Sequence, residues 1–553
     1  MILLLAALTV LVVLPAGMLV YASFLDAPPR PGSVHGNFTL DNYAAIGTER
    51  NFRATANSLI IGLGGTLFAL VGGSMLAWLF ARSNVPGKWL VGIAGVAPMF
   101  MSALVTSLAW SILASPKRGY INIFFESLGF DFGIDIYTLT GIIWVMGISY
   151  MPYVFLLVSS SFSMMNPELE EAAAMSGASK WKTFRTVTFP LVAPATIGAS
   201  LLVFVLVLEN FPVPQILGSK ADVATLPSYI YSLMRLTPAH SNEAAAVSII
   251  LTVLTFLLVF LQNLYVRKRN YTTVSGKGFR PKLIDLGVWR WPAFIAVTIY
   301  IIVSVVLPFL ALFLNAAIGQ RFIASISDLL DFSALNLNRF VDMLTMNDVQ
   351  LGLQNSLYIA LGTALFGTLL YFIMTYTVQR TRAPGRRLIE YIGMIPLAVP
   401  SLVLGLGFLW SWFLLPIPLY GTIAVLVLAY AVRFMPQGYT GISSSLTQIH
   451  PDLEDSAFLS GASRARSIWN ITLPLLRSGL VSTMLLIAVL TMRELSTAVF
   501  LFSSQTRPIS IVIFDQWENG SLANAAAISL LYSLLLLVLT VISQRFSKSR
   551  AQL

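Results

Sequence analysis

Two stretches of the chain that lie 284 residues apart resemble each other closely: residues 166–177 read NPELEEAAAMSG, and residues 450–461 read HPDLEDSAFLSG. The likeness continues at the same offset, where VTFP at 187–190 matches ITLP at 471–474. The best-matched residues are polar and lie between long apolar runs, so chance similarity among apolar segments does not explain them. We therefore interpret the chain as two homologous halves.

Further matches extend the repeat toward the start of each half. Met151-Pro152 matches Met435-Pro436 at the offset of 284, whereas NSL at 57–59 matches NSL at 355–357 at an offset of 298. The first half therefore holds 14 additional residues, which we place in the loop 115–139. An even number of spans separates the two repeated loops, which predicts a parallel repeat about an axis along the membrane normal.

Composition predicts a membrane protein. Of the 553 residues, 57% are hydrophobic and 10% are charged, and the mean hydropathy is +0.80, whereas a soluble globular chain carries about 25% charged residues. The absence of cysteine excludes disulfides, thiolate nucleophiles and cysteine metal ligands. The three histidines, His35, His240 and His450, are far apart in the sequence. We therefore expect no metal site and no cofactor in this chain.

We predict an all-α membrane protein with about twelve transmembrane helices, because open strand edges cannot satisfy their hydrogen bonds in lipid. A spanning helix needs about 20 residues. Residues 1–24 lack a basic start and a small-x-small cleavage pattern, so we interpret them as the first span rather than a signal peptide. The predicted spans are 2–24, 56–80, 89–114, 140–162, 194–216 and 243–265, then 292–315, 355–378, 388–415, 421–445, 479–502 and 525–544.

The basic residues predict the orientation. Of the 34 Lys and Arg, 22 fall in one set of loops, ten on the opposite side, and Arg433 and Arg493 within predicted spans. The richer side is expected to be cytoplasmic, together with both termini. This placement in a membrane accounts for the net charge of +10, so we expect contact with lipid and no nucleic-acid partner.

The two halves predict three segments. The first half is 1–265, with its transmembrane core at about 53–265. A cytoplasmic linker follows at 266–291. The second half is 292–553, with its core at about 351–545.

The repeated loop resembles the EAA signature of binding-protein-dependent ABC importer permeases, which reads EAA, three residues, Gly, nine residues and Ile-x-Leu-Pro. The spacing holds in both copies, although the second softens EAA to DSA. The resemblance implies two six-helix halves of the type I importer permease fold. It also implies that the loops couple to ATPase subunits through Glu171, Ala172, Ala173, Gly177 and Pro190 in the first half and Asp455, Ala457, Gly461 and Pro474 in the second.

A physical reason supports this interpretation of the loop. Acidic residues at the start of a short helix suit its dipole (Glu170 and Glu171; Glu454 and Asp455). A glycine can end the helix in the left-handed conformation. Such a helix can lie across the membrane face and fit a groove in a partner protein. The alternative is an ordinary interfacial helix with basic flanks.

The chain itself carries no nucleotide-binding motif. The segment SGKG at 275–278 lacks both the upstream glycine and the following Ser or Thr of G-x-x-x-x-G-K-[ST]. We therefore expect a transport subunit rather than an enzyme, with ATP and magnesium bound by two separate ATPase subunits. The resemblance also implies a periplasmic substrate-binding protein as a partner.

The fused layout resembles the ferric-iron and thiamine permeases, and some phosphonate permeases share it. LENFPVPQILG at 208–218, RELST at 493–497 and FDQWENG at 514–520 favour iron. We therefore expect ferric iron as the substrate, with thiamine or phosphonate as alternatives. An ion-coupled secondary transporter would need coupling carboxylates within the membrane but no matched loops. An ABC export component is disfavoured by the EAA spacing and the short outer loops.

Charged residues inside the predicted spans point to the pathway. Glu209 and the Arg493-Glu494 pair lie at matching depth in the fifth and eleventh spans, and the repeat places Glu209 and Arg493 at equivalent positions. Such residues normally find partners or face water. We predict that Glu209 and Arg493 approach each other across the halves and line or close the pathway, the alternative being local pairing or solvation. Two interpretations remain for the acidic residues of the outer loops: they form an acidic mouth of the pathway, or they are ordinary charges on exposed loops. These residues are Asp131, Asp135, Asp515 and Glu518.

Overall fold

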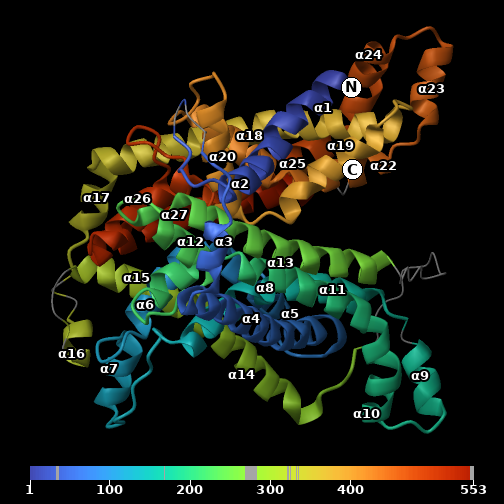
Figure 1. Ribbon diagram of the computed structural model, residues 1–553. Helices are drawn as coiled ribbons and strands as arrows, with labels where there is room; N and C mark the ends of the chain where they lie inside the picture. The colour runs from blue at the N-terminus through green and yellow to red at the C-terminus, as the bar shows by residue number, and fades with distance from the viewer. Residues whose placement is uncertain are drawn as a thin grey trace.

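The computed structural model is built from helices joined by loops (Figure 1). It describes residues 1–30, 32, 36–166, 168–267, 283–319, 323, 325–331, 333 and 335–548. Within these residues there is no strand, only two isolated bridges, Leu25 with Phe38 and Ser83 with Ile284. The all-α prediction is therefore confirmed. Most of the predicted linker, residues 268–282, lies outside the described part.

Nine helices in the described part are long and apolar enough to cross a membrane. Each overlaps one predicted span. By element they are α1–α2 (Ile2–Leu8 and Leu14–Ser23), α4 (Glu49–Arg82), α8 (Leu139–Met164), α10–α11 (Lys180–Thr183 and Phe189–Leu208), α13 (Ser241–Arg267), α14–α15 (Arg290–Ile301 and Leu307–Ile318), α18 (Asn347–Arg380), α24–α25 (Arg464–Ser467 and Leu473–Arg493) and α27 (Leu522–Lys548).

Four of these spans contain a π-helical turn that ends two residues before a proline. The turns are Thr9–Val13, Phe184–Thr188, Ile302–Val306 and Ile468–Thr472, before Pro15, Pro190, Pro308 and Pro474. Proline has no N–H for the bond to the residue four positions earlier, and its ring crowds that carbonyl. A wider turn relieves the conflict, so the helices continue through their prolines.

The other three predicted spans are not continuous helices, and each is broken into two shorter ones. The segment 89–114 forms α5 (Lys88–Ala94), a 3₁₀ turn and α6 (Ala103–Leu113). The segment 388–415 forms α19 (Arg386–Met394) and α20 (Ser401–Leu414), with a bend of 114° across the break. The segment 421–445 forms α21 (Ile423–Arg433) and α22 (Met435–Thr447). The breaks lie at or beside Pro98, Pro396, Pro400 and Pro436, which end helical hydrogen bonding.

The first span of each half packs against the other half. Helix α2 contacts α20 of the second half as well as α13, and α15 contacts α6 of the first half as well as α27. Within the halves, α4 packs on α8 and α11, and α18 packs on α25, α21 and α22. The two halves therefore form one interlocked body rather than two separate bundles.

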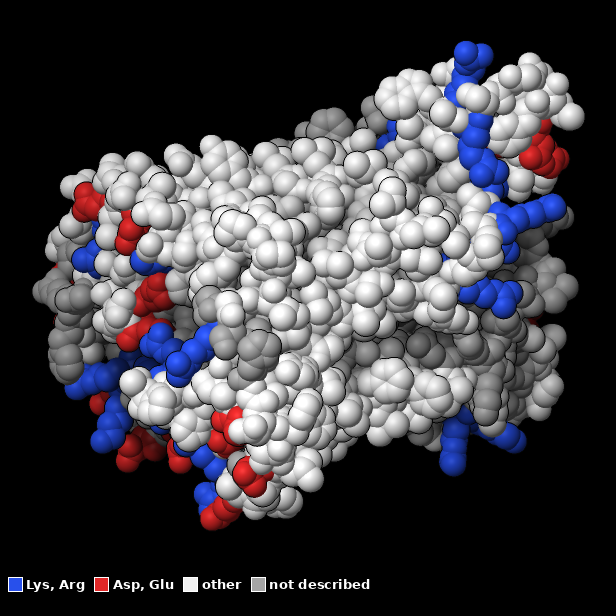
Figure 2. Space-filling model, turned by 45° about the horizontal axis from the view of Figure 1, so that its top comes forward, with Lys and Arg blue, Asp and Glu red and all other residues white. Residues whose placement is uncertain are grey.

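The two ends of the molecule differ. Helices α9 (Glu168–Met175) and α10 lie with α23 (Asp452–Leu459) and α24 at one end in Figure 1, which we call the loop end. Helices α7 (Tyr120–Ser127) and α16 (Ile326–Leu329) lie at the opposite end, the far end. On the face shown in Figure 2, charged side chains gather at the two ends and a broad uncharged band lies between them. This is the distribution expected for a body that spans a bilayer.

Candidate coupling loops and the contact between the halves

The repeated loops form two short helices, α9 and α23, that end in the same way. Gly177 and Gly461 have φ of +80° and +85°. In the first loop the Gly177 N–H bonds the Ala174 carbonyl and the Ala178 N–H bonds the Ala173 carbonyl, each at 3.0 Å. The second loop repeats this pattern from Gly461 to Phe458 at 3.0 Å and from Ala462 to Ala457 at 2.9 Å. Both helices therefore end in a Schellman motif, whose left-handed residue is normally glycine.

A serine then starts the next helix in each half. The Lys182 N–H donates to the Ser179 hydroxyl at 3.3 Å, and the Arg466 N–H donates to the Ser463 hydroxyl at 3.4 Å. Serine is favoured at this capping position because it satisfies a free N–H of the first turn. Pro190 and Pro474 lie beyond the π turns of these same spans. The fixed spacing of the motif therefore reflects four consecutive parts of the structure: a short helix, the glycine that ends it, the serine that caps the next helix, and a long span.

A carboxylate, half-buried in the first loop and buried in the second, anchors each short helix to the spans. Glu170 forms an ion pair with Arg82 at the end of α4 and accepts a hydrogen bond from the Thr188 hydroxyl at 2.6 Å. Glu454 accepts from the Thr472 hydroxyl at 2.8 Å and from Tyr376 at 2.9 Å, and lies 3.6 Å from the Arg380 Nε. Arg82 and Arg380 are equivalent in the repeat, as are Thr188 and Thr472. The anchor is thus built twice from equivalent residues.

The opposite surface of each short helix is exposed. Glu171 and Asp455 lie on it, next to Ala172, which is also exposed, while Ala173 and Ala457 are half-buried. Two large apolar side chains per helix also lie in solvent, Leu169 and Met175 on α9 and the equivalent Leu453 and Leu459 on α23. Met175 is 85% exposed and Leu459 91%. An apolar side chain held so far into solvent at a repeated position indicates a surface that a partner covers.

Sequence reasoning missed the anchoring role of Glu170 and Glu454. It assigned them to the helix dipole and gave Arg82 and Arg380 no individual role. A signal was available, because Arg82 and Arg380 share the repeat offset of 298 at the ends of corresponding spans. Only the folded chain brings them to carboxylates far away in sequence.

An ion pair joins the two halves inside the body. The Arg433 Nη2 lies 2.5 Å from the Glu209 Oε1, and both side chains are almost fully buried. Glu209 caps the C-terminal end of α11 in the first half, and Arg433 is the last residue of α21 in the second. The Ser401 backbone N–H, at the start of α20, also donates to Glu209. The carboxylate therefore bridges a helix end of one half and a helix start of the other.

The expected pair of Glu209 with Arg493 does not form. The Arg493 Nη2 donates instead to the Met101 carbonyl at 3.1 Å, in the break before α6. The Glu494 Oε1 accepts the Thr497 N–H at 3.1 Å, and its charge acts on both Glu209 and Arg433. Glu209 and Arg493 thus each contact the opposite half, but through different partners, a side chain at the end of α21 and a backbone carbonyl in the break before α6.

The placement of these charges also differs from the prediction. Glu209 and Arg493 lie at the ends of their helices rather than inside spans, because α11 ends at Leu208 and α25 at Arg493, whereas the predicted spans continue to 216 and 502. Sequence reasoning missed Arg433 as the partner. The signal was present, since Arg433 was one of two basic residues inside predicted spans, and such residues normally have a partner.

The acidic residues at the far end are mostly paired. Glu518 accepts the Tyr231 hydroxyl at 2.9 Å and lies 3.5 Å from Arg235, while Asp515 lies 3.4 Å from Arg507. Burial raises the pKa of Asp515, and the charge of Arg507 opposes this. Asp135 accepts the Tyr137 N–H at 2.8 Å, and Asp131 is exposed. Within the described residues, no group of three or more His, Asp or Glu is placed to hold a metal ion.

The interlocked halves, the two repeated loops and the charged contact between the halves define a membrane protein built from an internal repeat. The chain belongs to the family of binding-protein-dependent transport system inner membrane components, whose domain matches it twice, at residues 69–271 and 379–551. It is therefore a fused, two-half permease of the ABC importer class.

Several relatives match over both halves. A ferric transport system permease protein of Actinobacillus pleuropneumoniae is 27% identical over 86% of this chain and 68% of its own length. An Fe(3+)-transport system permease protein of Haemophilus influenzae is 24% identical over 85% of each chain. A putative 2-aminoethylphosphonate permease of Salmonella typhi is 27% identical over 47% of this chain. A solved bacterial alginate ABC importer covers 46% of this chain with a TM-score of 0.40 and 20% identity.

Proposed function

We propose that this permease forms the pathway for ferric iron, delivered by an extracytoplasmic binding protein and driven by two separate ATPase subunits. The observation that carries the coupling assignment is the pair of repeated helices α9 and α23. Each is anchored by a glutamate that lies beside an arginine at the end of a neighbouring span, and each exposes two large apolar side chains. Two equivalent docking helices fit two ATPase subunits, one at each loop.

The anchors connect the docking helices to the contact between the halves. Glu170 on α9 bonds Thr188, which lies in the continuous helix Trp181–Leu208. The next residue after that helix is Glu209, the partner of Arg433. A displacement of α9 by an ATPase is therefore transmitted along one helix to the ion pair between the halves. In the second half Glu454 accepts a hydrogen bond from Thr472, which lies in the helix Arg464–Arg493. The last residue of that helix, Arg493, donates to the Met101 carbonyl of the first half.

In this mechanism the Glu209–Arg433 pair holds the pathway closed. Separating two buried charges is costly unless each gains another partner or water. Glu494 already lies near both, and entry of water between the halves would solvate all three charges. The pair can therefore break as the halves separate and form again as they close.

The orientation of the proposed cycle follows the charges. At the loop end Lys and Arg predominate in the view of Figure 2, whereas both signs occur at the far end. Basic loops favour the cytoplasmic side. The loop end then faces the ATPases, and the far end faces the binding protein.

Relatives of fused length support ferric iron as the substrate. Two ferric permeases match this chain over 86% and 85% of its length, covering both halves. Permeases named for 2-aminoethylphosphonate and for spermidine and putrescine match over 47% and 46%, about one half. A phosphonate or a polyamine is therefore the second candidate substrate, since such permeases are 27% and 30% identical over one half.

Deletion of the gene followed by uptake measurements tests the substrate. We expect the deletion strain to lose uptake of radioactive ferric iron and to grow poorly on ferric sources under iron limitation. The wild-type gene should restore both. Thiamine and 2-aminoethylphosphonate use should be unaffected. Normal iron uptake together with loss of either other substrate would reject iron and identify the alternative.

A further inference from the structure

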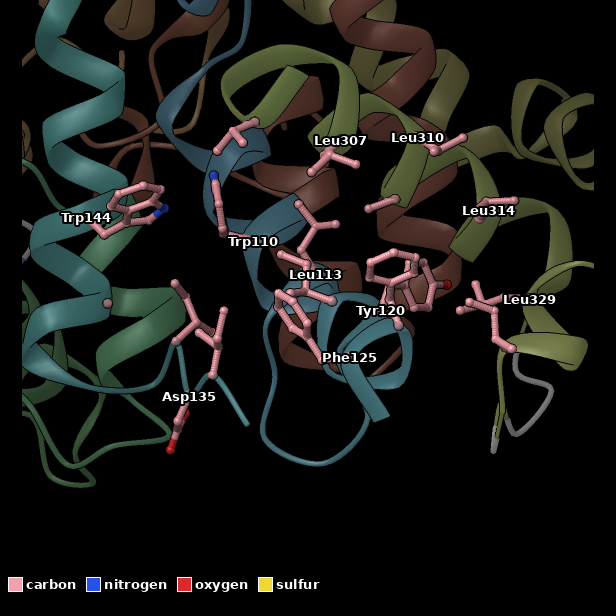
Figure 3. A pocket seen from close by; sticks show the side chains of 18 of the residues that line it. Trp110, Leu113, Tyr120, Phe125, Asp135, Trp144, Leu307, Leu310, Leu314 and Leu329 are labelled. Atoms are coloured by element: carbon pink, nitrogen blue, oxygen red, sulfur yellow. The ribbon is translucent and has the colours of Figure 1, made fainter. Parts of the chain in front are cut away.

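A large apolar cavity lies at the far end, between the two halves. Its volume is about 780 Å³. The first half contributes α6, α7, α8 and residues 134–136, and the second half contributes α15 and α16. Figure 3 shows Trp110, Leu113, Phe125 and Leu307 around it. Asp135 lies at its edge with the carboxyl group turned away from the other labelled side chains.

The cavity depends on the additional loop of the first half. Tyr120, Phe125 and residues 134–136 all belong to the loop 115–139, where the sequence places its 14 extra residues. Helix α7 stands in this loop, whereas the corresponding connection between α20 and α21 holds only residues 415–422. The cavity is therefore a feature of one half of the repeat and is separate from the coupling loops and from the Glu209–Arg433 pair.

The cavity opens toward the membrane. Leu310 lines it and is exposed, and it belongs to the spanning helix Gly287–Ile318. Phe124 of α7 and Leu330 beside α16 also line it and are exposed. An exposed apolar side chain on a spanning helix faces lipid. The opening therefore joins the lipid-facing surface, in the leaflet remote from the repeated loops.

We propose that this cavity binds an acyl chain of a phospholipid from that leaflet. Apolar cavities stay dry, and one of about 150 Å³ holds a benzene molecule, so 780 Å³ has room for a long alkyl chain. The Trp110 indole N–H is buried at this wall with no hydrogen-bond partner among the described residues. The bound chain then fills the space between α7 of one half and α15 of the other.

Photo-cross-linking tests the site directly. The purified full-length protein is placed in nanodiscs that contain a phospholipid with a diazirine on its acyl chain. We expect adducts on the peptides that carry residues 120–125 and 307–314, above the level at Leu365, an exposed residue of α18. Adducts at these peptides that do not exceed the level at Leu365 would overturn the proposal.

Two variants separate the cavity from general lipid contact. Leu307→Trp fills the cavity and should reduce the adducts on both peptides to the level at Leu365. Val306→Trp is the matched control, because Val306 is the neighbouring residue of the same span, exposed and not part of the wall. It should keep the adducts. Should Leu307→Trp fail to fold, Leu314→Trp replaces it, since Leu314 also lines the cavity. Equal adducts in the filled variant and the control would contradict the proposal.

Discussion

Glu209 lies at a helix end inside the body, and a carboxylate so placed depends on its partners. Helix C-termini carry partial negative charge, which opposes a carboxylate there. Arg433 and the start of α20, both from the other half, supply the compensation. The contact therefore stabilises the closed arrangement of the halves more than it stabilises either half alone.

The pair should behave as a coupled unit. Removing one partner of a buried pair costs about 3–5 kcal/mol, because the remaining charge stays buried without compensation. We expect Glu209→Ala or Arg433→Ala alone to lower the thermal midpoint of the purified protein more than the double substitution does.

The exposed pair Glu49–Arg53 is the control for that cycle. Its side chains are 76% and 71% exposed, and such pairs contribute about 0–1 kcal/mol. Arg53→Ala should leave the midpoint nearly unchanged. Strictly additive effects of Glu209→Ala and Arg433→Ala would contradict the coupling.

The anchoring glutamates should matter more than their exposed neighbours. Glu170→Ala leaves Arg82, which is 1% exposed, without its carboxylate, and a buried unpaired charge costs about 3–5 kcal/mol. We expect loss of uptake and faster hydrogen exchange in α9. Glu454→Ala should do the same for α23.

Glu168→Ala is the matched control, because Glu168 is an exposed glutamate of the same helix. It should leave uptake and exchange near wild type. Equal loss in Glu168→Ala and Glu170→Ala would reject a specific anchor.

At the scale of the element, the coupling loop is a rigid helical hairpin on the end of a long span. Its stop residue has φ of +80° or +85°, and its start is held by the capping serine. The π turn that follows lets the span run through Pro190 or Pro474. Movement of the short helix is therefore passed to the span rather than absorbed in a flexible loop.

The stop glycines should be required for coupling. A Cβ at Gly177 or Gly461 meets open space, so a substitution strains only the left-handed backbone, at a cost of about 1–2 kcal/mol. We expect Gly177→Leu and Gly461→Leu to insert normally, to abolish uptake and to uncouple ATP hydrolysis.

Gly520 provides the control, since it also has positive φ (+77°) and open surroundings but lies away from the loops. Gly520→Leu should keep uptake. Normal uptake in both loop variants would remove the basis for the coupling role, and lost expression would indicate that these glycines only form turns.

At the scale of the whole molecule, the two docking helices face one end of an interlocked body (Figure 1). Because each first span packs against the opposite half, a force at either loop acts on both halves. Two ATPases that close on each other would therefore move the halves together.

Single cysteines can test this arrangement, because the native chain has none. We expect Met175→Cys and Leu459→Cys to react with a maleimide in the purified permease and to become protected when the ATPase subunits bind. Leu128→Cys, exposed at the far end, should react equally with and without ATPase. Protection of only one loop would reject two equivalent ATPase sites.

Local chemistry in the sequence determined much of this protein. Apolar runs predict its spans, and the offset of 284 predicts the two halves and both coupling loops. The glycine stops also follow from sequence, since a left-handed helix end requires glycine for a steric reason that acts within a few residues. A proline shows where helical hydrogen bonding is interrupted, but not whether the helix continues. Pro190 is accommodated by a π turn, whereas Pro400 lies at a break.

Only the tertiary structure decided which charges meet. Arg82 joins Glu170, and Arg433 rather than Arg493 joins Glu209, across separations of 88 and 224 residues. A repeat relates equivalent residues by an axis, but contact across that axis depends on distance from it and on side-chain direction, and helix neighbours point about 100° apart. The cavity beside α7 could likewise not be predicted from the sequence, because its walls come from both halves and form only when the helices pack.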